Sequence, residues 1–490
     1  MRMVRDILLK EKSRAVNTKN LIHKQLSLST NTEKIGFSYI AKRLMLFYMR
    51  RFFFWRIFVK LGYMLDIKFI RENKDIVASA IKNKNRDVDL DILLELSDRR
   101  KSLKQEIDNV NQGRNEAAKS RDVEKGTQLK KELEMLEKDF NEIDKQFFAL
   151  MAKVPNIPSP DTPIGKDESS NKVMREWGTK PQFDFEPKEH DELGKALGIL
   201  DIETAGEISG SRFAYIKGDL ALLQFTLLQF CLSILTNKEQ LKSIAKEKNV
   251  QVSIGTFVPI IPPVFIKPAV QNRMARFMTP EEHYMFQSDD LMLIGSAEHT
   301  LGPLYMDKIL EEKDLPIRLV GYSTAFRREA GSHGKDTKGI IRQHQFDKLE
   351  METFCLPENS LQEQEFLVAI QEHILQSLDL PYQVVAICTG DMAFPDYRQI
   401  DIETWMPGQN RYRETHSADL TASFQSRRLN TRVRRNDGKI EPLHMNDATA
   451  VAMGRMLVAI MENYQQADGS IKIPEVLRTY MGGQQIISKK

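Results

Sequence analysis

Two heptad patterns constrain the fold of this 490-residue chain more than any other feature. Apolar residues and two arginines recur at alternating intervals of three and four residues from Leu93 to Ala117. The same spacing returns from Leu129 to Val154. Such a repeat is typical of a helix that packs along one face against a second helix. Because a short break at residues 120–126 separates two patterns of matching length, the sequence predicts a long antiparallel helical hairpin, or coiled-coil arm.

Basic side chains gather toward the predicted tip of this arm. On a projecting rod they could contact a phosphate backbone, although a charged helix face is also common without any ligand. The positions we take as candidate nucleic-acid contacts are Arg114, Lys119, Arg121, Lys125 and Lys130.

Residues 321–352, GYSTAFRREAGSHGKDTKGIIRQHQFDKLEME, form the second informative stretch. Two apolar-rich ends flank a loop of glycine, serine, aspartate and lysine, which predicts a pair of strands. Arg327 and Glu329 are two residues apart on the first predicted strand, so their side chains should share a face.

The return strand repeats the pattern, because Arg342, Phe346 and Glu350 recur at every fourth residue. One sheet face would then hold arginines that can bind phosphate oxygens, a ring that can stack on a purine, and carboxylates that can accept hydrogen bonds from an amino group. A solvated hairpin with a salt-bridged face is the alternative interpretation.

FRREAGSHGKDTKGIIRQHQFDKLE closely resembles the second signature motif of class II aminoacyl-tRNA synthetases, in the form found in seryl-tRNA synthetases. The run FVPIIPPVFIK occupies the place of the first motif, which in the family forms the dimer interface, and PLHMNDATAVAMGRM resembles the third. The resemblance covers about residues 64–483. It implies an α+β fold in which an antiparallel sheet flanked by helices follows a helical arm that reaches tRNA.

The resemblance also implies an ATP-dependent serine–tRNA ligase with Mg²⁺ as cofactor. Arg327 and Arg455 are the expected catalytic residues, with Arg327 on the α-phosphate. The residues expected around ATP are Arg327, Arg328, Glu329, Arg342, Phe346, Glu414, Thr415, His416, Ser417 and Arg455, with Mg²⁺ near Glu414 and Ser417. Those expected around L-serine are Ser296, Ala297, Glu298, Arg327, Glu350 and Thr449.

Four positions depart from the family's usual residues. Ser296 stands where threonine is common, and Thr449 stands where a serine often helps to recognise the substrate hydroxyl. Asp447 replaces the usual asparagine. His416 replaces a serine, and because imidazole is a poor magnesium ligand we interpret His416 as structural.

Net charge changes sign at Met64. Residues 1–63 carry 14 lysines and arginines against 3 acidic residues, whereas residues 64–490 carry 57 against 65. We therefore expect translation to begin at Met64 and residues 1–63 not to be native, with a membrane-surface segment or an organelle presequence as alternatives. The predicted domains are an arm domain at 64–154, a proline-rich linker at 155–172 and a catalytic domain at 173–490.

Composition narrows the remaining choices. Apolar residues make up 41% of the chain and charged residues 28%, as in soluble globular proteins. The 3 cysteines are far apart, which argues against a disulfide framework or a zinc site. We expect a cytoplasmic homodimer without a membrane partner that charges tRNA(Ser), with tRNA(Sec) as a second candidate. The competing hypotheses are a catalytically silent tRNA-binding or partner-binding paralogue and a ligase that loads an amino acid onto a carrier protein.

Overall fold

The computed structural model describes residues 65–276, 280–286, 288–329 and 338–489. These residues belong to one structural unit, Gly62–Lys490. The basic extension at 1–63 and its predicted boundary at Met64 lie outside the described residues.

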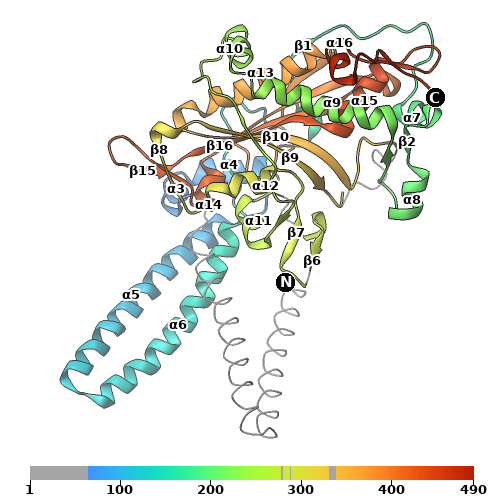
Figure 1. The fold of residues 1–490 in the computed structure, drawn as a ribbon. Helices are drawn as coiled ribbons and strands as arrows, with labels where there is room; N and C mark the ends of the chain where they lie inside the picture. The colour runs from blue at the N-terminus through green and yellow to red at the C-terminus, as the bar shows by residue number, and fades with distance from the viewer. Residues whose placement is uncertain (1–64, 277–279, 287, 330–337, 490) are drawn as a thin grey trace, which may run out of the picture. The chain divides into compact units, whose positions relative to one another are not determined.

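The arm is an antiparallel pair of long helices, α5 (Leu90–Ser120) and α6 (Val123–Met151), which confirms the predicted hairpin (Figure 1). Two short helices, α3 (Ile67–Glu72) and α4 (Lys74–Asn83), precede it. The break is shorter than predicted, because Arg121 ends α5 in the left-handed conformation and the Asp122 side chain caps α6 by accepting a hydrogen bond from the Lys125 amide.

An arginine interrupts the apolar seam of the arm without leaving its charge unpaired. Arg100 forms a 2.6 Å ion pair with Asp144 of the opposite helix. Its guanidinium also lies over the rings of Phe140, Phe147 and Phe148, at 4.9 to 5.7 Å from their centroids. Ionic and cation–π contacts therefore replace apolar packing at this layer.

The region predicted to be the catalytic domain is organised on a mixed eight-stranded sheet. Neighbouring strands are antiparallel except β4 and β9, which are parallel. In spatial order the strands are β1 (Lys172–Trp177), β11 (Tyr382–Ala386), β12 (Arg398–Met406), β13 (Arg411–Ala422), β16 (His444–Ala452), β10 (Gln345–Cys355), β9 (Ile317–Phe326) and β4 (Val258–Ile260). This arrangement agrees with the predicted antiparallel class of sheet.

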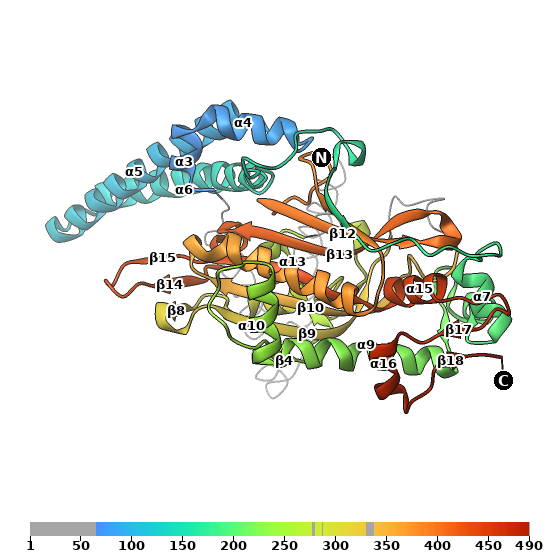
Figure 2. The ribbon, with the colours of Figure 1, turned by 90° about the horizontal axis from the view of Figure 1, so that it is seen from above.

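Three helices, α9 (Gly218–Leu235), α13 (Ser360–Ser377) and α15 (Met453–Asn463), bury apolar side chains in one core with residues of the sheet (Figure 2). Met351, Ala418 and Ala448 are sheet residues in this core. Burial of this apolar surface is the main favourable contribution to folding. Among the described helices, α9 is long and apolar enough to cross a membrane, and half of that segment is buried within the protein.

The predicted central strand pair is confirmed, but both strands are shorter than predicted. β9 ends at Phe326 and β10 begins at Gln345. The prediction that Arg327, Glu329 and Arg342 lie on strands is therefore wrong. These three residues lie in the loops that continue from the strand ends.

The first-motif run is divided between two sheets. Val258–Ile260 forms the outer strand β4 of the large sheet, whereas Phe265–Ile266 forms β5, which pairs with β7 (Leu291–Leu293). Pro262 and Pro263 separate the two strands, in keeping with the inability of proline to donate to a strand ladder.

Candidate active site

A pocket opens where the loops beyond β9 and β10 meet β13, β16 and the start of α15. Eight of the predicted site residues line it: Arg327, Glu329, Arg342, Phe346, Glu414, Thr415, Thr449 and Arg455. The sequence reasoning missed the other lining residues, which are Ile340, Ile341, Gln343, Lys348, Ala452 and Gly454. Lys348 could have been found, since it lies between Phe346 and Glu350 in the two-residue alternation of a strand.

Arg327 is fixed at the end of β9 although it is no longer in the strand. Its Nε donates to the Gly295 carbonyl at 3.0 Å, and its guanidinium lies over the Phe346 ring, 5.3 Å from the centroid. Desolvation lowers the pKa of Arg327, and the nearby positive charge of Arg455 lowers it further. Glu414, by contrast, raises the pKa of Arg455. An anion bound beside Arg327 would stabilise the guanidinium charge there.

Arg455, the third residue of α15, faces Glu414 of β13. Its Nη1 lies 2.9 Å from the Glu414 carboxylate and donates to the Glu414 carbonyl at 2.9 Å. Removal from water would raise the pKa of Glu414, yet Arg455 and Arg327 together lower it. Glu414 is therefore a carboxylate at neutral pH.

Glu329 and Arg342 form a 2.6 Å ion pair across the mouth of the strand pair. Glu329 has φ of 50°, in the left-handed region that residues with a β-carbon rarely adopt. The two side chains predicted to bind different parts of ATP thus contact each other in this structure.

A β-bulge at Thr415 determines which residues of β13 face the site. Glu414 pairs with Glu403 and His416 with Ile402, which leaves Thr415 as the extra residue. Glu414 and Ser417 therefore lie on the same face, although residues three apart on a regular strand point to opposite faces. The sequence gives no sign of this bulge.

Oxygen atoms suited to a magnesium ion gather on that face. The Ser417 hydroxyl donates to Asp419 at 2.8 Å, and Asp401 is the partner of Ser417 in the neighbouring strand. Burial, followed by the charges of Glu414 and Asp419, raises the pKa of Asp401 well above its usual value. This excess of negative charge and the hard oxygen donors fit Mg²⁺.

Three residues predicted to contact ATP lie outside the pocket lining, namely Arg328, His416 and Ser417. His416 is fully buried, its Nδ1 lies 2.9 Å from the Thr415 hydroxyl, and burial lowers its pKa to about 4. The imidazole is therefore neutral at pH 7, which is in keeping with the interpretation of His416 as structural. Arg328 is exposed, and its guanidinium lies over the Tyr284 ring at 5.9 Å.

The predicted serine contacts form a buried acidic region beside the pocket. Ser296 donates to Glu350 at 3.0 Å, and Glu350 also pairs with the pocket residue Lys348. Carboxylate oxygens of Glu298, Glu350 and Asp447 lie within 4.8 Å of one another. Such a set can hold a positively charged group, an ammonium included.

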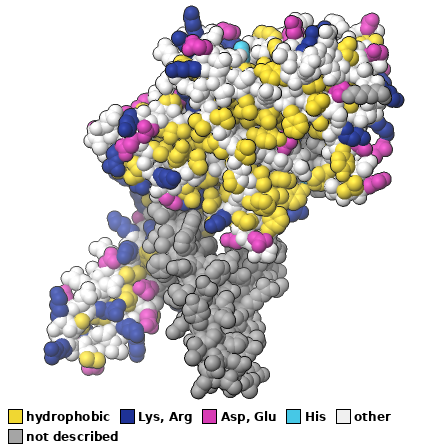
Figure 3. All heavy atoms as spheres, in the orientation of Figure 1, with side chains coloured by type: hydrophobic (Ala, Val, Ile, Leu, Met, Phe, Trp, Pro, Cys, Tyr) yellow, Lys and Arg dark blue, Asp and Glu magenta, His cyan; other side chains and the backbone are white. Residues whose placement is uncertain are grey.

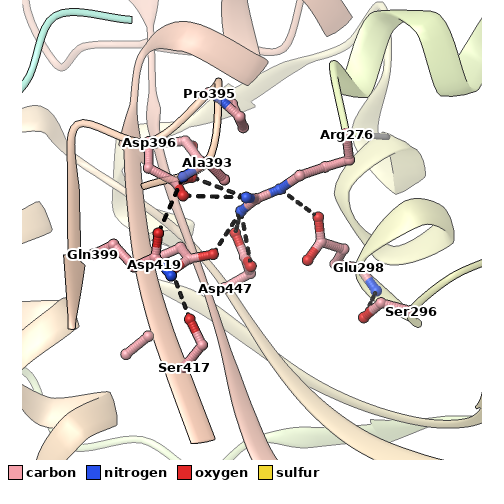
Figure 4. Close-up of polar contacts among 12 residues, drawn as sticks. Arg276, Ser296, Glu298, Ala393, Pro395, Asp396, Gln399, Ser417, Asp419 and Asp447 are labelled. Atoms are coloured by element: carbon pink, nitrogen blue, oxygen red, sulfur yellow. Dashed lines mark hydrogen bonds and ion pairs between the residues drawn. The ribbon is translucent and has the colours of Figure 1, made fainter. Parts of the chain in front are cut away.

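Arg276 compensates part of this charge, and the sequence analysis missed it (Figure 4). Its Nε lies 2.7 Å from Glu298, and its Nη2 lies 3.0 Å from Asp447. Burial disfavours ionised Glu298, but Arg276 together with His299, Asp447 and Lys348 outweighs it and lowers the pKa of Glu298 to about 2. Asp447, one of the departures from the family pattern, is thus contacted by an arginine 171 positions away, although burial still raises the pKa of Asp447 well above its usual value. No local motif marks that arginine.

Two family models match the chain. The model described as tRNA synthetase class II core domain (G, H, P, S and T) matches residues 284–464, and the model described as seryl-tRNA synthetase N-terminal domain matches residues 64–158. The two matches cover the predicted catalytic centre and the arm.

Curated relatives match along most of the chain. The serine–tRNA ligase of Caldicellulosiruptor saccharolyticus is 39% identical over 436 residues, which is 86% of this chain and 99% of the relative. That of Pseudothermotoga lettingae is 38% identical over 434 residues, with the same coverage of both chains.

Solved structures agree with these relatives. The crystal structure of seryl-tRNA synthetase from Pyrococcus horikoshii complexed with ATP has 34% identity and a TM-score of 0.77, covering 87% of this chain and 100% of that one. The cytoplasmic serine–tRNA ligase from Naegleria fowleri in complex with AMP has 28% identity and a TM-score of 0.74, covering 88% and 100%. The predicted resemblance and fold class are confirmed, and the chain belongs to the seryl-tRNA synthetase family of class II aminoacyl-tRNA synthetases.

Proposed function

We propose that this pocket activates L-serine with ATP and that the chain then transfers serine to tRNA, which is the serine–tRNA ligase activity of its family. The observation that carries the proposal is the meeting of Arg327 and Arg455 in one pocket, next to the buried carboxylates Glu298 and Glu350. Cationic groups suit a polyphosphate, and the carboxylates suit the ammonium group of an amino acid.

The arginines would stabilise the charge of the phosphates during reaction. Arg327 binds the α-phosphate, and Arg342 and Arg455 bind the β- and γ-phosphates. Phe346 stacks on adenine, while Glu329 accepts a hydrogen bond from the adenine amino group. The serine carboxylate attacks the α-phosphorus and pyrophosphate leaves. Since the nucleophile is already an anion, orientation and charge stabilisation matter more than a general base.

Glu414 and Ser417 would hold Mg²⁺. The bulge at Thr415 supports this assignment because it turns both side chains to one face, beside Asp401 and Asp419. A magnesium ion bound there supplies positive charge to the phosphates of ATP.

The buried acidic region would select serine. Glu298 and Glu350 bind the ammonium group, and Ser296 and Thr449 contribute hydroxyls. Ala297 lies between Ser296 and Glu298 in the chain, directly before α12 (Glu298–Leu301). A polar pocket that hydrogen-bonds a substrate hydroxyl strongly rejects an analogue that lacks it. We therefore expect alanine to be excluded through its missing hydroxyl and threonine through its size.

The helical arm would bind tRNA(Ser), and tRNA(Sec) is a second candidate. Lys119, Arg121, Lys125 and Lys130 are exposed near the tip of the arm, and Arg114 is half-buried. Exposed cations at the end of a rod suit contacts with a phosphate backbone.

The outer edge of the large sheet would form a homodimer interface. β4 is the last strand of the sheet, and Val258, Ile261 and Phe265 on this run are 55%, 87% and 45% exposed. Figure 3 shows hydrophobic side chains over a broad part of one face of the catalytic domain. Such exposed apolar surface is typical of a protein–protein interface. The three buried free cysteines suit a reducing cytoplasmic compartment.

Amino-acid-dependent ATP–pyrophosphate exchange tests the proposal directly. We expect exchange with serine and not with the other nineteen amino acids, followed by charging of total tRNA. Exchange without charging would favour a carrier-protein ligase, and no exchange at all would favour a catalytically silent binding protein. Either outcome would contradict the proposal.

A further inference from the structure

A buried lysine at the base of the arm donates hydrogen bonds to a loop of the catalytic domain. This loop, Ala393–Asp396, connects β11 to β12. Lys84, just after α4, is 3% exposed, and its ammonium group donates to the carbonyls of Ala393, Phe394 and Asp396 at 3.2, 3.3 and 2.6 Å. These three contacts replace water around the buried Lys84 amine, whose pKa burial lowers to about 7, so they fix the course of the loop.

A second contact holds the same loop from the segment that follows the arm. Asn156, just beyond α6, is buried and donates to the Pro395 carbonyl at 2.8 Å and to the Thr421 carbonyl at 3.0 Å. Arg86 adds a cation–π contact with the Phe394 ring at 5.3 Å. The segments that precede and follow the two arm helices in the chain therefore fix one short loop.

Asp396 of this loop contacts Arg276, which in turn contacts residues of the proposed serine site. Asp396 is fully buried, and its carboxylate lies 3.1 Å from Nη1 of Arg276. The same guanidinium contacts Glu298 through Nε and Asp419 and Asp447 through Nη2 (Figure 4). The nitrogens of the Arg276 guanidinium contact four carboxylates. Loss of the contact with Asp396 would therefore change the orientation of the guanidinium toward Glu298, Asp419 and Asp447.

We propose that Lys84 is a positioning residue for serine binding: by fixing the 393–396 loop, it places Asp396 against Arg276 and so sets the position and charge of Glu298 and Asp447. The arm domain thereby adjusts the affinity of the catalytic domain for its amino acid. This inference rests on the proposed role of Glu298 in serine binding.

The contacts predict a larger effect on serine than on ATP, because Arg276 contacts Glu298 and Asp447 directly but reaches the proposed magnesium ligand Ser417 only through Asp419. Lys84 reaches Glu298 and Asp447 through two intermediate side chains. On the ATP side, Arg455 is held by Glu414 and Phe346 belongs to β10. A role of Lys84 in stability alone would leave the affinity of the folded enzyme for both substrates unchanged.

The test compares Lys84→Met with Lys82→Met in serine-dependent pyrophosphate exchange without tRNA. Lys82 lies in the last turn of α4, two residues before Lys84. Its side chain is exposed and donates no hydrogen bond to the 393–396 loop. We expect Lys84→Met to raise the KM for serine roughly tenfold, within the range seen for residues along coupling networks. The KM for ATP should change little, and Lys82→Met should leave both constants unchanged. An unchanged KM for serine in folded Lys84→Met protein, or an equal rise in both constants, overturns the inference.

Asp396→Asn provides a second variant should Lys84→Met fail to fold. It keeps the shape of the side chain and removes the charge that faces Arg276. Asp396→Asn should raise the KM for serine and leave the KM for ATP unchanged. An unchanged KM for serine overturns the inference. In the double variant the two effects should be less than additive, because both act through one contact path; additive effects would show independent action and also overturn it.

Wild-type protein separates failure of this inference from failure of the proposed function. If the wild type exchanges with another amino acid or with none, the proposed function fails and the inference falls with it. If the wild type uses serine and the variants retain its KM, only the inference fails.

Discussion

Arg276→Met should destabilise the catalytic domain through charge rather than through packing. Methionine retains a long flexible side chain, but it leaves Glu298, Asp396, Asp419 and Asp447 without the guanidinium that contacts all four. Removing one partner of a buried ion pair costs about 3–5 kcal/mol, because the remaining charge is buried without compensation. We expect the free energy of unfolding at pH 7 to fall by about that amount.

Urea unfolding followed by tryptophan fluorescence measures this change, since Trp177 and Trp405 both belong to the large sheet. Arg434→Met is the matched control. Arg434 pairs with Glu311 at 3.3 Å, but both side chains are about half exposed, at 47% and 48%. An exposed ion pair contributes less than about 1 kcal/mol, so the control should unfold nearly as the wild type does.

The pH dependence distinguishes a loss of charge compensation from a packing defect. In the wild type, Arg276 together with nearby groups lowers the pKa of Glu298 from 4.5 to about 2, so ionised Glu298 stabilises the fold above pH 4.5 and this contribution is lost as the pH falls toward 2. Without Arg276, the pKa of Glu298 rises, and the pKa values of Asp396 and Asp447, which burial already raises, rise further. The variant therefore loses stability as the pH rises from 5 to 7.

The stability difference between wild type and Arg276→Met should accordingly be smaller at pH 5 than at pH 7. Adding Asp447→Asn to Arg276→Met should restore part of the lost stability, because one buried acid is removed. A difference that stays constant between these pH values, or a loss below about 1 kcal/mol at pH 7, would refute the reasoning.

Three further predictions follow from the site, the arm and the sheet edge. Arg327→Gln should lower kcat for pyrophosphate exchange by about 10²–10³, as loss of one group that stabilises transition-state charge does, and an unchanged kcat would remove Arg327 from the catalytic role. Lys119→Glu combined with Arg121→Glu should raise the KM for tRNA in charging, most at low salt, while leaving serine-dependent exchange unchanged; a salt-independent effect would contradict phosphate contacts. Ile261→Asp should shift the protein from dimer to monomer in sedimentation, and a persistent dimer would move the proposed interface away from β4.

The regular parts of the fold could be predicted because each depends on local periodicity. The arm follows from its three- and four-residue spacing, and even Arg100 fits that pattern once Asp144 and three phenylalanine rings surround it.

The site depends on features that periodicity does not reveal. Thr415 forms a bulge only because of the register between two strands, and that register decides that Glu414 and Ser417 share a face. Arg276 meets Asp447 through the tertiary fold alone. Resemblance to a family supplied the expected roles of Glu414 and Ser417, but it could not supply Arg276, whose position belongs to none of the three motifs.

The separation of charge within the site orients the substrate before any chemistry occurs. Arg327, Arg342 and Arg455 line the pocket, while the buried carboxylates of Glu298 and Glu350 form an acidic side beside it. A serine zwitterion would place its ammonium group on the acidic side, so its carboxylate would point toward the arginines. That orientation brings the nucleophilic oxygen to the side where the α-phosphate binds. The electrostatic pattern of the folded chain would thus supply the alignment that this reaction needs in place of a general base.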